Sequence, residues 1–468
     1  MPSLSWRTGR DKKDLEPCPA PAAAAPATID ATPVAGHQFS AELIALFTDL
    51  VLKAATSQRA AAGVLKQLAP YVPGLRRTPC ANAGRLWLMR LGLFELLRKK
   101  ETARDWVWIM DHTVQLGPHK CLVIVGVRLS AWRRKKAPLE HEDLSLLRLV
   151  PMKQSTAAAV AEQLEATRKE MGVAPVAVLS DEGAELKSGM ALFRAQSAQA
   201  RRVPHVFDIK HKAAILLKRE LHDDAMWQSF VTHTNRAKLQ TTLTELAFLV
   251  PPSLRTKARY MNLDTLVAWG TRALAYLDDP RDLPGQTIDR KRLQQKLGWL
   301  AEYRSALVAW AELLAITQRA VSYVRRTGYH RRAAKELKRR LLPLVRTPGG
   351  DRLQAGIVTF VREQSRGVKK GRPVLGTSEI LESLLGKYKR LQGTHSKGGM
   401  TGSLLNIGAA VLRKTSDTIQ KALAAVPVAA AGKWIRDNLG LTIPAQQALA
   451  FQGNKNCLKN QLLITPSF

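Results

Sequence analysis

The order of apolar segments between residues 105 and 211 constrains the fold more than any other feature of the sequence. Apolar runs rich in valine, isoleucine and leucine lie at 106–111, 120–129, 146–152, 173–180 and 203–207. Short runs of this composition are typical of buried strands. Residues 156–171 and 184–193 instead repeat apolar positions at helical spacing. Three adjacent strands, a helix, a strand, a helix and a strand predict a mixed α/β sheet covered by helices.

Residues 101–211 form the first part of this predicted core. The segments before and after them are predicted to be helical or unfolded. Residues 1–36 contain an Ala- and Pro-rich run that cannot bury enough apolar surface to fold alone, so we expect a disordered leader. Residues 37–100 carry three amphipathic segments and a basic end. They suit either a helical DNA-binding domain, such as a helix-turn-helix, or a unit that packs against the next domain. Helical patterns without strands continue through 212–370, 371–395 and 396–468.

The charge of the chain indicates which class of partner it binds. Its 468 residues include 72 Lys and Arg but 38 Asp and Glu, a formal net charge of +34. A protein this basic usually binds a polyanion, because each phosphate that it neutralises releases condensed counterions. No apolar run approaches the roughly 20 residues that span a bilayer, and the four cysteines show neither metal-ligand nor disulfide spacing. We therefore expect a nucleic-acid-binding protein of a reducing cytoplasm, without a membrane partner.

Two aspartates follow apolar strands. Asp111 ends the first run, in Trp-Ile-Met-Asp-His-Thr, and Asp181 directly follows the fourth, in Val-Leu-Ser-Asp-Glu-Gly. If the two strands are central neighbours, both carboxylates emerge at one edge of the sheet. Carboxylate oxygens suit a hard cation such as Mg²⁺, which proteins hold with a few carboxylates and substrate phosphates. Alone, an aspartate after a strand is most often a turn residue or a helix cap, and that alternative stays open, above all for Asp181.

A third carboxylate is expected from the amphipathic helix predicted at 376–392. Glu379 and Glu382 are three residues apart and share a face of this helix. The helix dipole already explains an acid in the first turn, at Glu379, so we favour Glu382 and keep Glu379 as the alternative. Gly386, one turn after Glu382, leaves room for a DNA backbone.

With these acids in order, the chain resembles the DDE transposases, which have an RNase H-like catalytic core, and it looks like a bacterial insertion-sequence transposase. The matching segments are DWVWIMDHT at 105–113, VLSDEGAELK at 178–187 and SEILESLLGKYK at 378–389. Carried over residue by residue, the resemblance implies that Asp111, Asp181 and Glu382 are the catalytic ligands of two Mg²⁺ or Mn²⁺ ions. The stretch between Asp181 and Glu382 is longer than in many members, and those with an all-helical insertion there match better.

The resemblance also implies a function. A DDE transposase cleaves DNA at a transposon end with water, and the freed 3′-OH then attacks target DNA at the same site. It would act as a homodimer or higher oligomer on DNA, associated with the nucleoid in a bacterial cytoplasm. Two other functions stay open: another RNase H-like nuclease, and a non-catalytic DNA-binding protein derived from a transposase.

A further short match, Val-Phe-Asp-Ile-Lys-His at 206–211, resembles a motif that some of these families carry after the second aspartate. It would place Asp208 and His211 beside the active site. A purely structural role for both residues is an equal alternative.

A basic segment precedes the predicted catalytic helix. Residues 321–372 carry 15 Lys or Arg and three acids. We expect this surface and the end of the helix to contact DNA phosphates, although a charge run is more commonly only a solvated face. The expected contacts are Arg325, Arg326, Arg331, Arg332, Lys335, Lys338, Arg339, Arg340, Lys369, Lys370, Arg372, Lys387 and Lys389.

Overall fold

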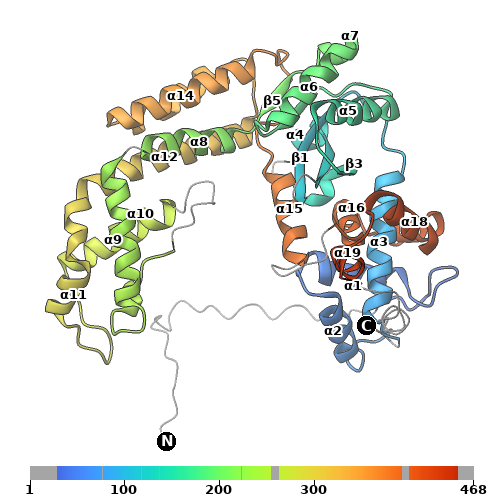
Figure 1. Cartoon of the computed structure of the whole chain (residues 1–468), viewed down its shortest axis with the longest axis horizontal. Helices are drawn as coiled ribbons and strands as arrows, with labels where there is room; N and C mark the ends of the chain where they lie inside the picture. Colours follow the sequence, from blue (N-terminus) through green and yellow to red (C-terminus); the bar gives the residue numbers. More distant parts are fainter. Residues whose placement is uncertain are drawn as a thin grey trace, which may run out of the picture.

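The structure has three parts: a five-stranded sheet, a unit of terminal helices and a helical arm (Figure 1). The computed structural model describes residues 29–75, 77–116, 119–135, 138–222, 224–253, 263–392 and 400–451, with the backbone alone for 114–116. Most of the predicted leader, residues 1–28, lies outside these ranges. No described helix combines the length and the apolar character that crossing a membrane requires.

The sheet is mixed, as predicted. Its strands are β1 (Trp106–Leu116), β2 (His119–Arg128), β3 (Leu144–Met152), β4 (Ala177–Ser180) and β5 (His205–Phe207). They lie in the order β3-β2-β1-β4-β5. The pairs β1–β2 and β2–β3 are antiparallel, whereas β1–β4 and β4–β5 are parallel. The long strand β1 is therefore central, and β4 is its direct neighbour.

Helices cover both faces of the sheet, and the alternation of side chains along β1 assigns each residue to one face. Trp106, Trp108 and Met110 pack with α5 (Ala157–Met171) and α6 (Ala184–Gln196). Val107 and Ile109 belong to the other face, which contains α3 (Ala81–Leu97) and α15 (Glu379–Gln392). Asp111 continues this second series, so its side chain lies on the α15 face.

The strand boundaries differ from the prediction most clearly in β1, β4 and β5, and β3 begins two residues earlier, at Leu144. β1 does not end at Asp111, because the chain continues to Leu116 as one side of a hairpin with β2. β4 begins at Ala177 instead of residue 173, and β5 at His205 instead of residue 203. Pro204 directly precedes β5 and Pro175 lies two residues before β4, and neither has an N–H to donate to a ladder.

The first and last helices of the chain form one unit. Its N-terminal members are α1 (Ala41–Leu52), α2 (Gln58–Leu68) and α3, and its C-terminal members are α16 (Asn406–Val411), α17 (Ser416–Ala425) and α18 (Val428–Leu439). The last helix, α19 (Ile443–Ala450), buries no residue. Leu88 and Leu91 of α3 share a core with Ile419 and Leu423 of α17. Buried Arg90 donates to the backbone carbonyls of Leu423 and Val426. The predicted 37–100 segment thus packs against the rest of the molecule, and DNA binding by it stays a prediction.

The end of the predicted leader belongs to this unit as well. Val34 is buried in the same core, and the Ile29 N–H donates to the Pro73 carbonyl at 3.2 Å. Ile29 and Val34 thus contact this unit, whereas residues 30–33, 35 and 36 are exposed.

The predicted helical stretch 212–370 forms the arm. It consists of α8 (Ile209–His222), α9 (Ala225–Thr241), α10 (Leu263–Asp278), α11 (Arg290–Leu297), α12 (Arg304–Thr327), α13 (Ala333–Leu341) and α14 (Pro348–Ser365). Its described residues contain no strand. Trp227, Phe230 and Trp310 lie within ring-centroid distances of 5.0–6.0 Å of one another and fill the centre of the arm.

Shorter helical pieces complete the chain. These are α4 (Leu129–Arg134), α7 (Ala198–Arg201), η1 (His141–Asp143), η2 (Ala247–Leu249), η3 (Gly298–Tyr303), η4 (Leu342–Leu344) and η5 (Gly402–Leu405). After the arm, the chain returns to the sheet and forms α15, which contacts β1 and lies beside α16 (Figure 1). The helix begins at Glu379, three residues later than predicted.

Candidate active site

The pairing of β1 with β4 brings the two predicted aspartates together. Ile109 of β1 is the partner of Leu179 of β4, and Asp111 and Asp181 each follow two residues later. Neighbouring strands lie about 4.8 Å apart. Because both residues have the parity of the α15 face, their carboxylates leave the sheet side by side at the end of the parallel ladder.

The third acid, Glu382, comes from the first turn of α15. Buried Leu381, Leu384 and Leu385 fix the orientation of this helix on the sheet. The negative charge of Glu382 acts on Asp111, together with that of Asp181, and so does the positive charge of Lys389. The structure therefore brings the three acids into one electrostatic neighbourhood, although 201 positions of chain separate Asp181 from Glu382.

Contacts distinguish the two glutamates of α15. Both carboxylate oxygens of Glu379 bond Arg325, at 2.6 and 2.7 Å, and Oε1 also lies 3.0 Å from Lys210 Nζ. Burial raises the pKa of Glu379, but the hydrogen bonds from Arg325 and Lys210 outweigh burial and hold this pKa below its usual value. The charge of Glu379 is thus matched by two cations. Glu382, whose charge acts on Asp111, remains the better candidate.

Asp208 anchors the start of α15. This buried carboxylate accepts the Ser378 N–H at 2.5 Å and the Ser378 hydroxyl at 2.7 Å through Oδ2, and the His211 N–H at 2.8 Å through Oδ1. The Ser378 hydroxyl also lies 3.1 Å from Glu382 Oε1. Since a hydroxyl carries one proton, it can donate to only one carboxylate at a time. Asp208 therefore holds the loop before Glu382, which is a positioning role, while His211 contributes its backbone.

Among the acids of the site, Asp111 has the pKa that is shifted furthest from its usual value. Burial and the negative charges of Asp181 and Glu382 raise the pKa of Asp111 to about 7, against the His112 N–H and Lys389, which lower it. Burial is the largest cause of this shift, and the neighbouring carboxylates add to it. Perturbed acids of this kind are concentrated at functional sites.

The donor set fits a hard divalent cation in its chemistry. Within the described ranges, no three His, Cys, Asp or Glu side chains lie close enough to hold a metal ion as they stand. Each acid has an oxygen in a local hydrogen bond instead: Asp111 with the His112 N–H at 2.7 Å, Asp181 with the Gly183 N–H at 3.0 Å, and Glu382 with Ser378. All three are carboxylates, the ligands that Mg²⁺ prefers, and a bound cation would relieve their repulsion.

The predicted DNA-binding residues fall into separate places. Two of them lie near the acids: Arg325 forms an ion pair with Glu379, and the charge of Lys389 acts on Asp111. The α13 region exposes Arg331, Arg332, Lys335, Lys338, Arg339 and Arg340 on the arm, and Arg326 and Lys370 are also exposed.

Lys369 and Arg372 lie at the opposite end of the strands from the acids. With Arg104 and Arg202 they line a pocket of about 160 Å³, next to the residues that precede β4 and β5. The structure therefore does not place them beside the carboxylates.

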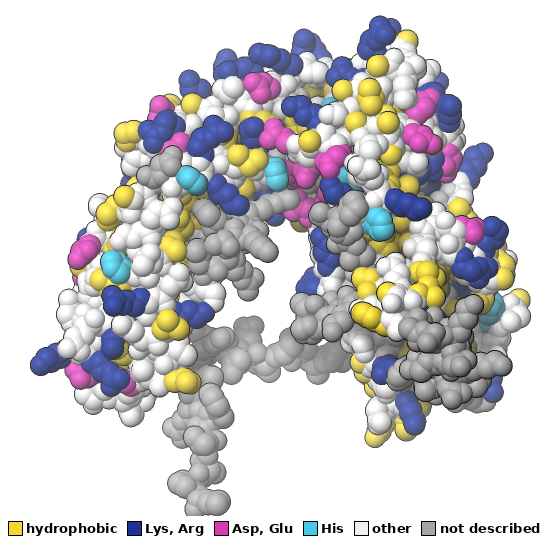
Figure 2. Space-filling view, viewed as in Figure 1, with side chains coloured by type: hydrophobic (Ala, Val, Ile, Leu, Met, Phe, Trp, Pro, Cys, Tyr) yellow, Lys and Arg dark blue, Asp and Glu magenta, His cyan; other side chains and the backbone are white. Residues whose placement is uncertain are grey.

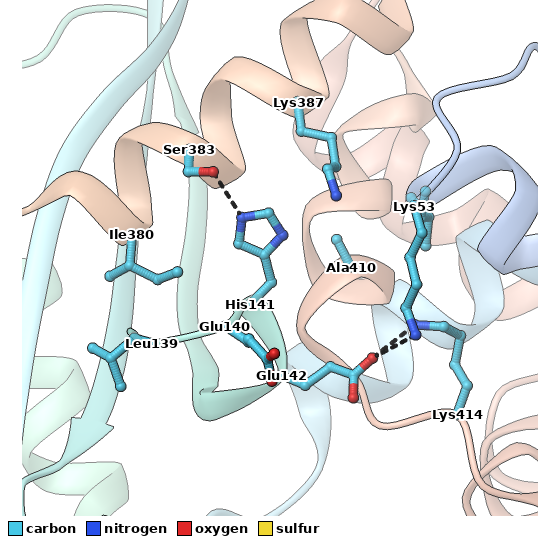
Figure 3. A pocket seen from close by; sticks show the side chains of 11 residues that line it. Lys53, Leu139, Glu140, His141, Glu142, Ile380, Ser383, Lys387, Ala410 and Lys414 are labelled. Carbon is cyan, nitrogen blue, oxygen red and sulfur yellow. Dashed lines mark hydrogen bonds and ion pairs between the residues drawn. The ribbon is translucent and has the colours of Figure 1, made fainter. Parts of the chain in front are cut away.

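Lys387 lies on another side of α15. It lines a pocket of about 440 Å³ with His141 and Ser383, between α15 and the terminal helices (Figure 3). This pocket was not anticipated from the sequence, because its walls come from four separate segments of the chain.

Sequence reasoning also missed Ser378 and Lys210 as site residues. Ser378 carried a partial signal, since a hydroxyl residue before a helix is a cap. Its carboxylate partner Asp208 lies 170 positions away, which no local pattern reveals.

Comparison with known proteins adds no relative: no protein-family model matches the chain, and no curated protein is similar to it.

Replacing Asp111 tests the electrostatics of the site without any metal. Native Asp111 keeps its proton up to about pH 7, whereas the unfolded chain loses it near pH 3.8. The native state therefore loses stability as the pH rises from about 4 to 7, and the penalty is complete above 7. In metal-free buffer at pH 8, we expect urea unfolding to give Asp111→Asn a free energy of unfolding roughly 2–4 kcal/mol above that of the wild type. At pH 4 we expect this difference to disappear. An advantage that does not change with pH would contradict the coupling.

Proposed function

We propose that the protein is a DDE-type DNA transposase with an RNase H-like core, which cleaves DNA at transposon ends and joins the freed 3′-OH to target DNA. The observation that carries the proposal is that Asp111 and Asp181 each lie two residues beyond the paired residues Ile109 and Leu179, and that the charges of Asp181 and Glu382 both act on Asp111. The five-stranded mixed sheet and the helical arm between Asp181 and Glu382 agree with the expected core and insertion.

In this proposal Asp111, Asp181 and Glu382 hold two divalent ions. When bound, a pair of such ions supplies an activated oxygen nucleophile and stabilises the leaving oxygen of an in-line displacement. The role of Asp208 is to fix the loop before Glu382 through Ser378. Lys389, close enough to act on Asp111, would face the phosphate that is cut. No Ser, Cys or Tyr nucleophile is required for this chemistry.

The shape of the molecule suits a long substrate. Figure 2 shows that this face is hollowed between the arm and the terminal helices, and that Asp and Glu side chains gather where the arm meets the sheet. Lys and Arg side chains spread along the outside of the arm in the same view. DNA lying along the basic surfaces would be held mainly by its phosphates. We propose that a homodimer or higher oligomer assembles on the DNA.

Carboxylate variants test the proposed active site. Asp111→Asn, Asp181→Asn and Glu382→Gln should each lower cleavage of DNA that carries the element's own ends by on the order of 10³-fold or more, because residues that act as a unit fail together. Glu379→Gln is the matched control on the same helix and should retain cleavage within about tenfold. Added Mg²⁺ should raise the melting temperature of the wild type and not that of Asp181→Asn. Cleavage by Asp111→Asn, or equal loss in both glutamate variants, would contradict the assignment.

A wild-type protein that binds these ends and never cuts them would favour the alternative of a non-catalytic DNA-binding protein. Cleavage without joining of a supplied 3′-OH would favour another RNase H-like nuclease.

Charge reversal on α13 tests the arm as a DNA surface. The fourfold variant of Arg331, Arg332, Arg339 and Arg340 to Glu should weaken binding to DNA ends and reduce the slope of log K against log salt by up to about 4, one for each lost phosphate contact. All four side chains are exposed, but Arg340 lies 5.4 Å from the centroid of the Tyr323 ring, so we expect a small fall in melting temperature without loss of the fold. An unchanged slope would remove this surface from the DNA path.

Gly386 tests how closely DNA approaches α15. A Cβ built on Gly386 meets nothing within 4 Å, and the same holds for Gly63 in the middle of α2. Alanine at either position should therefore stabilise the fold by about 0.5–1 kcal/mol. If the DNA backbone lies against α15, Gly386→Ala alone should weaken end binding. Equal binding by the two variants would show that this face of the helix is clear of DNA.

A further inference from the structure

The pocket beneath α15 is built by segments that are far apart in the chain. Its walls come from the end of α1, the η1 turn, α15, α16 and the residues that follow α16. Figure 3 shows Lys387 projecting from α15 toward the space between His141 and Lys53. At about 440 Å³, the pocket is large enough for a small ligand.

Two of its lysines are matched by acids. Lys53 lies 2.9 Å from Asp49 and 3.1 Å from Glu142. Lys414, with a side chain only 3% exposed, lies 3.3 Å from Asp49 and 3.9 Å from Glu142. Two acids thus balance two lysines and hold them at the rim of the pocket.

The third lysine, Lys387, is not balanced in this way. It makes no ion pair among the residues that the structure describes. Burial, and the positive charges of Arg390, Lys414 and Lys53, lower its pKa, and only Asp49 opposes them. An ammonium group in such surroundings is stabilised by an anion that reaches it.

Of the other polar groups that line the pocket, Glu140 is paired with Lys135 at 2.9 Å, and His141 and Ser383 can donate hydrogen bonds. The His141 Nε2 and the Ser383 hydroxyl lie 3.2 Å apart and close to Lys387 (Figure 3). Leu139 and Ile380 form an apolar wall beside them. A cation, a hydroxyl and an imidazole next to an apolar wall suit a phosphate group with a carbon skeleton attached.

We propose that this pocket binds a phosphate group of a nucleotide unit, with Lys387, Ser383 and His141 as its contacts. Ser383 directly follows Glu382 on α15, and Lys53 belongs to α1, so the bound phosphate would connect the candidate catalytic helix with the N-terminal helices. Where the nucleotide belongs to DNA, the inference rests on the proposed function and adds a point at which the strand is held near the active site. A free nucleotide offers the same chemistry.

Lysine labelling of the full-length wild-type protein tests the pocket without any need for cleavage. An amine-reactive reagent at neutral pH, read out by mass spectrometry, reports Lys387 against exposed Lys66 of α2. The probes are a random-sequence DNA duplex, dAMP and inorganic phosphate. We expect the duplex to slow labelling of Lys387 by about fivefold or more and to leave Lys66 nearly unchanged. Protection by the duplex alone assigns the site to the DNA backbone, and protection by dAMP as well assigns it to a free nucleotide.

Binding by variants provides the second measurement. Lys387→Gln should weaken duplex binding about tenfold and lower the salt slope by about 1, whereas the matched control Lys66→Gln should change neither. Ser383→Ala should give a smaller loss in the same direction. Unchanged labelling of Lys387 with all three probes would overturn the proposal, whatever the outcome of the cleavage assays. Loss of cleavage in the carboxylate variants with Lys387 still protected would leave both proposals standing.

Discussion

The register between β1 and β4 is the constraint on which the rest of the site depends. Parallel strands bring residues of equal offset together, so the partnership of Ile109 with Leu179 also fixes Asp111 beside Asp181. A slip of one residue would turn one aspartate to the opposite face, among the apolar side chains under α5 and α6. Fully buried residues precede each aspartate on both faces of the sheet, so a slip would require both apolar layers to repack.

The helical arm creates a second constraint, because it separates the sheet from α15 along the chain. Buried Asp208 connects the two. It lies between β5 and α8, and it holds Ser378 just before α15. The start and the end of the arm are thereby joined at one point of the sheet edge. Arg325 of α12 reinforces the junction through Glu379. The arm can extend outward because both of its ends are fixed next to the carboxylates.

The terminal helices add a third layer to this arrangement. α1 to α3 share a core with α16 and α17, so the two ends of the chain are parts of one unit. This unit borders α15 at the pocket that contains Lys387. Charge in that seam is unevenly balanced: Lys53 and Lys414 are paired with acids, whereas Lys387 forms no ion pair with a described residue and only the charge of Asp49 favours its ammonium form. A basic protein that binds a polyanion has reason to keep such a cation uncompensated, because the ligand supplies the opposite charge.

The sequence by itself determined the class of fold, the five strands in order, the strandless arm, the aspartate that follows β4 and a helix that carries two glutamates. These features are visible because apolar periodicity and turn residues are local. Only the tertiary structure decided which strands are neighbours, that β1 runs past Asp111, and that Glu379 is paired with Arg325 and Lys210. It also decided that Asp208 holds Ser378 and that Lys387 lies in a pocket. Each of these depends on contacts between residues far apart in the chain, which the packing of the folded core selects and no local pattern encodes.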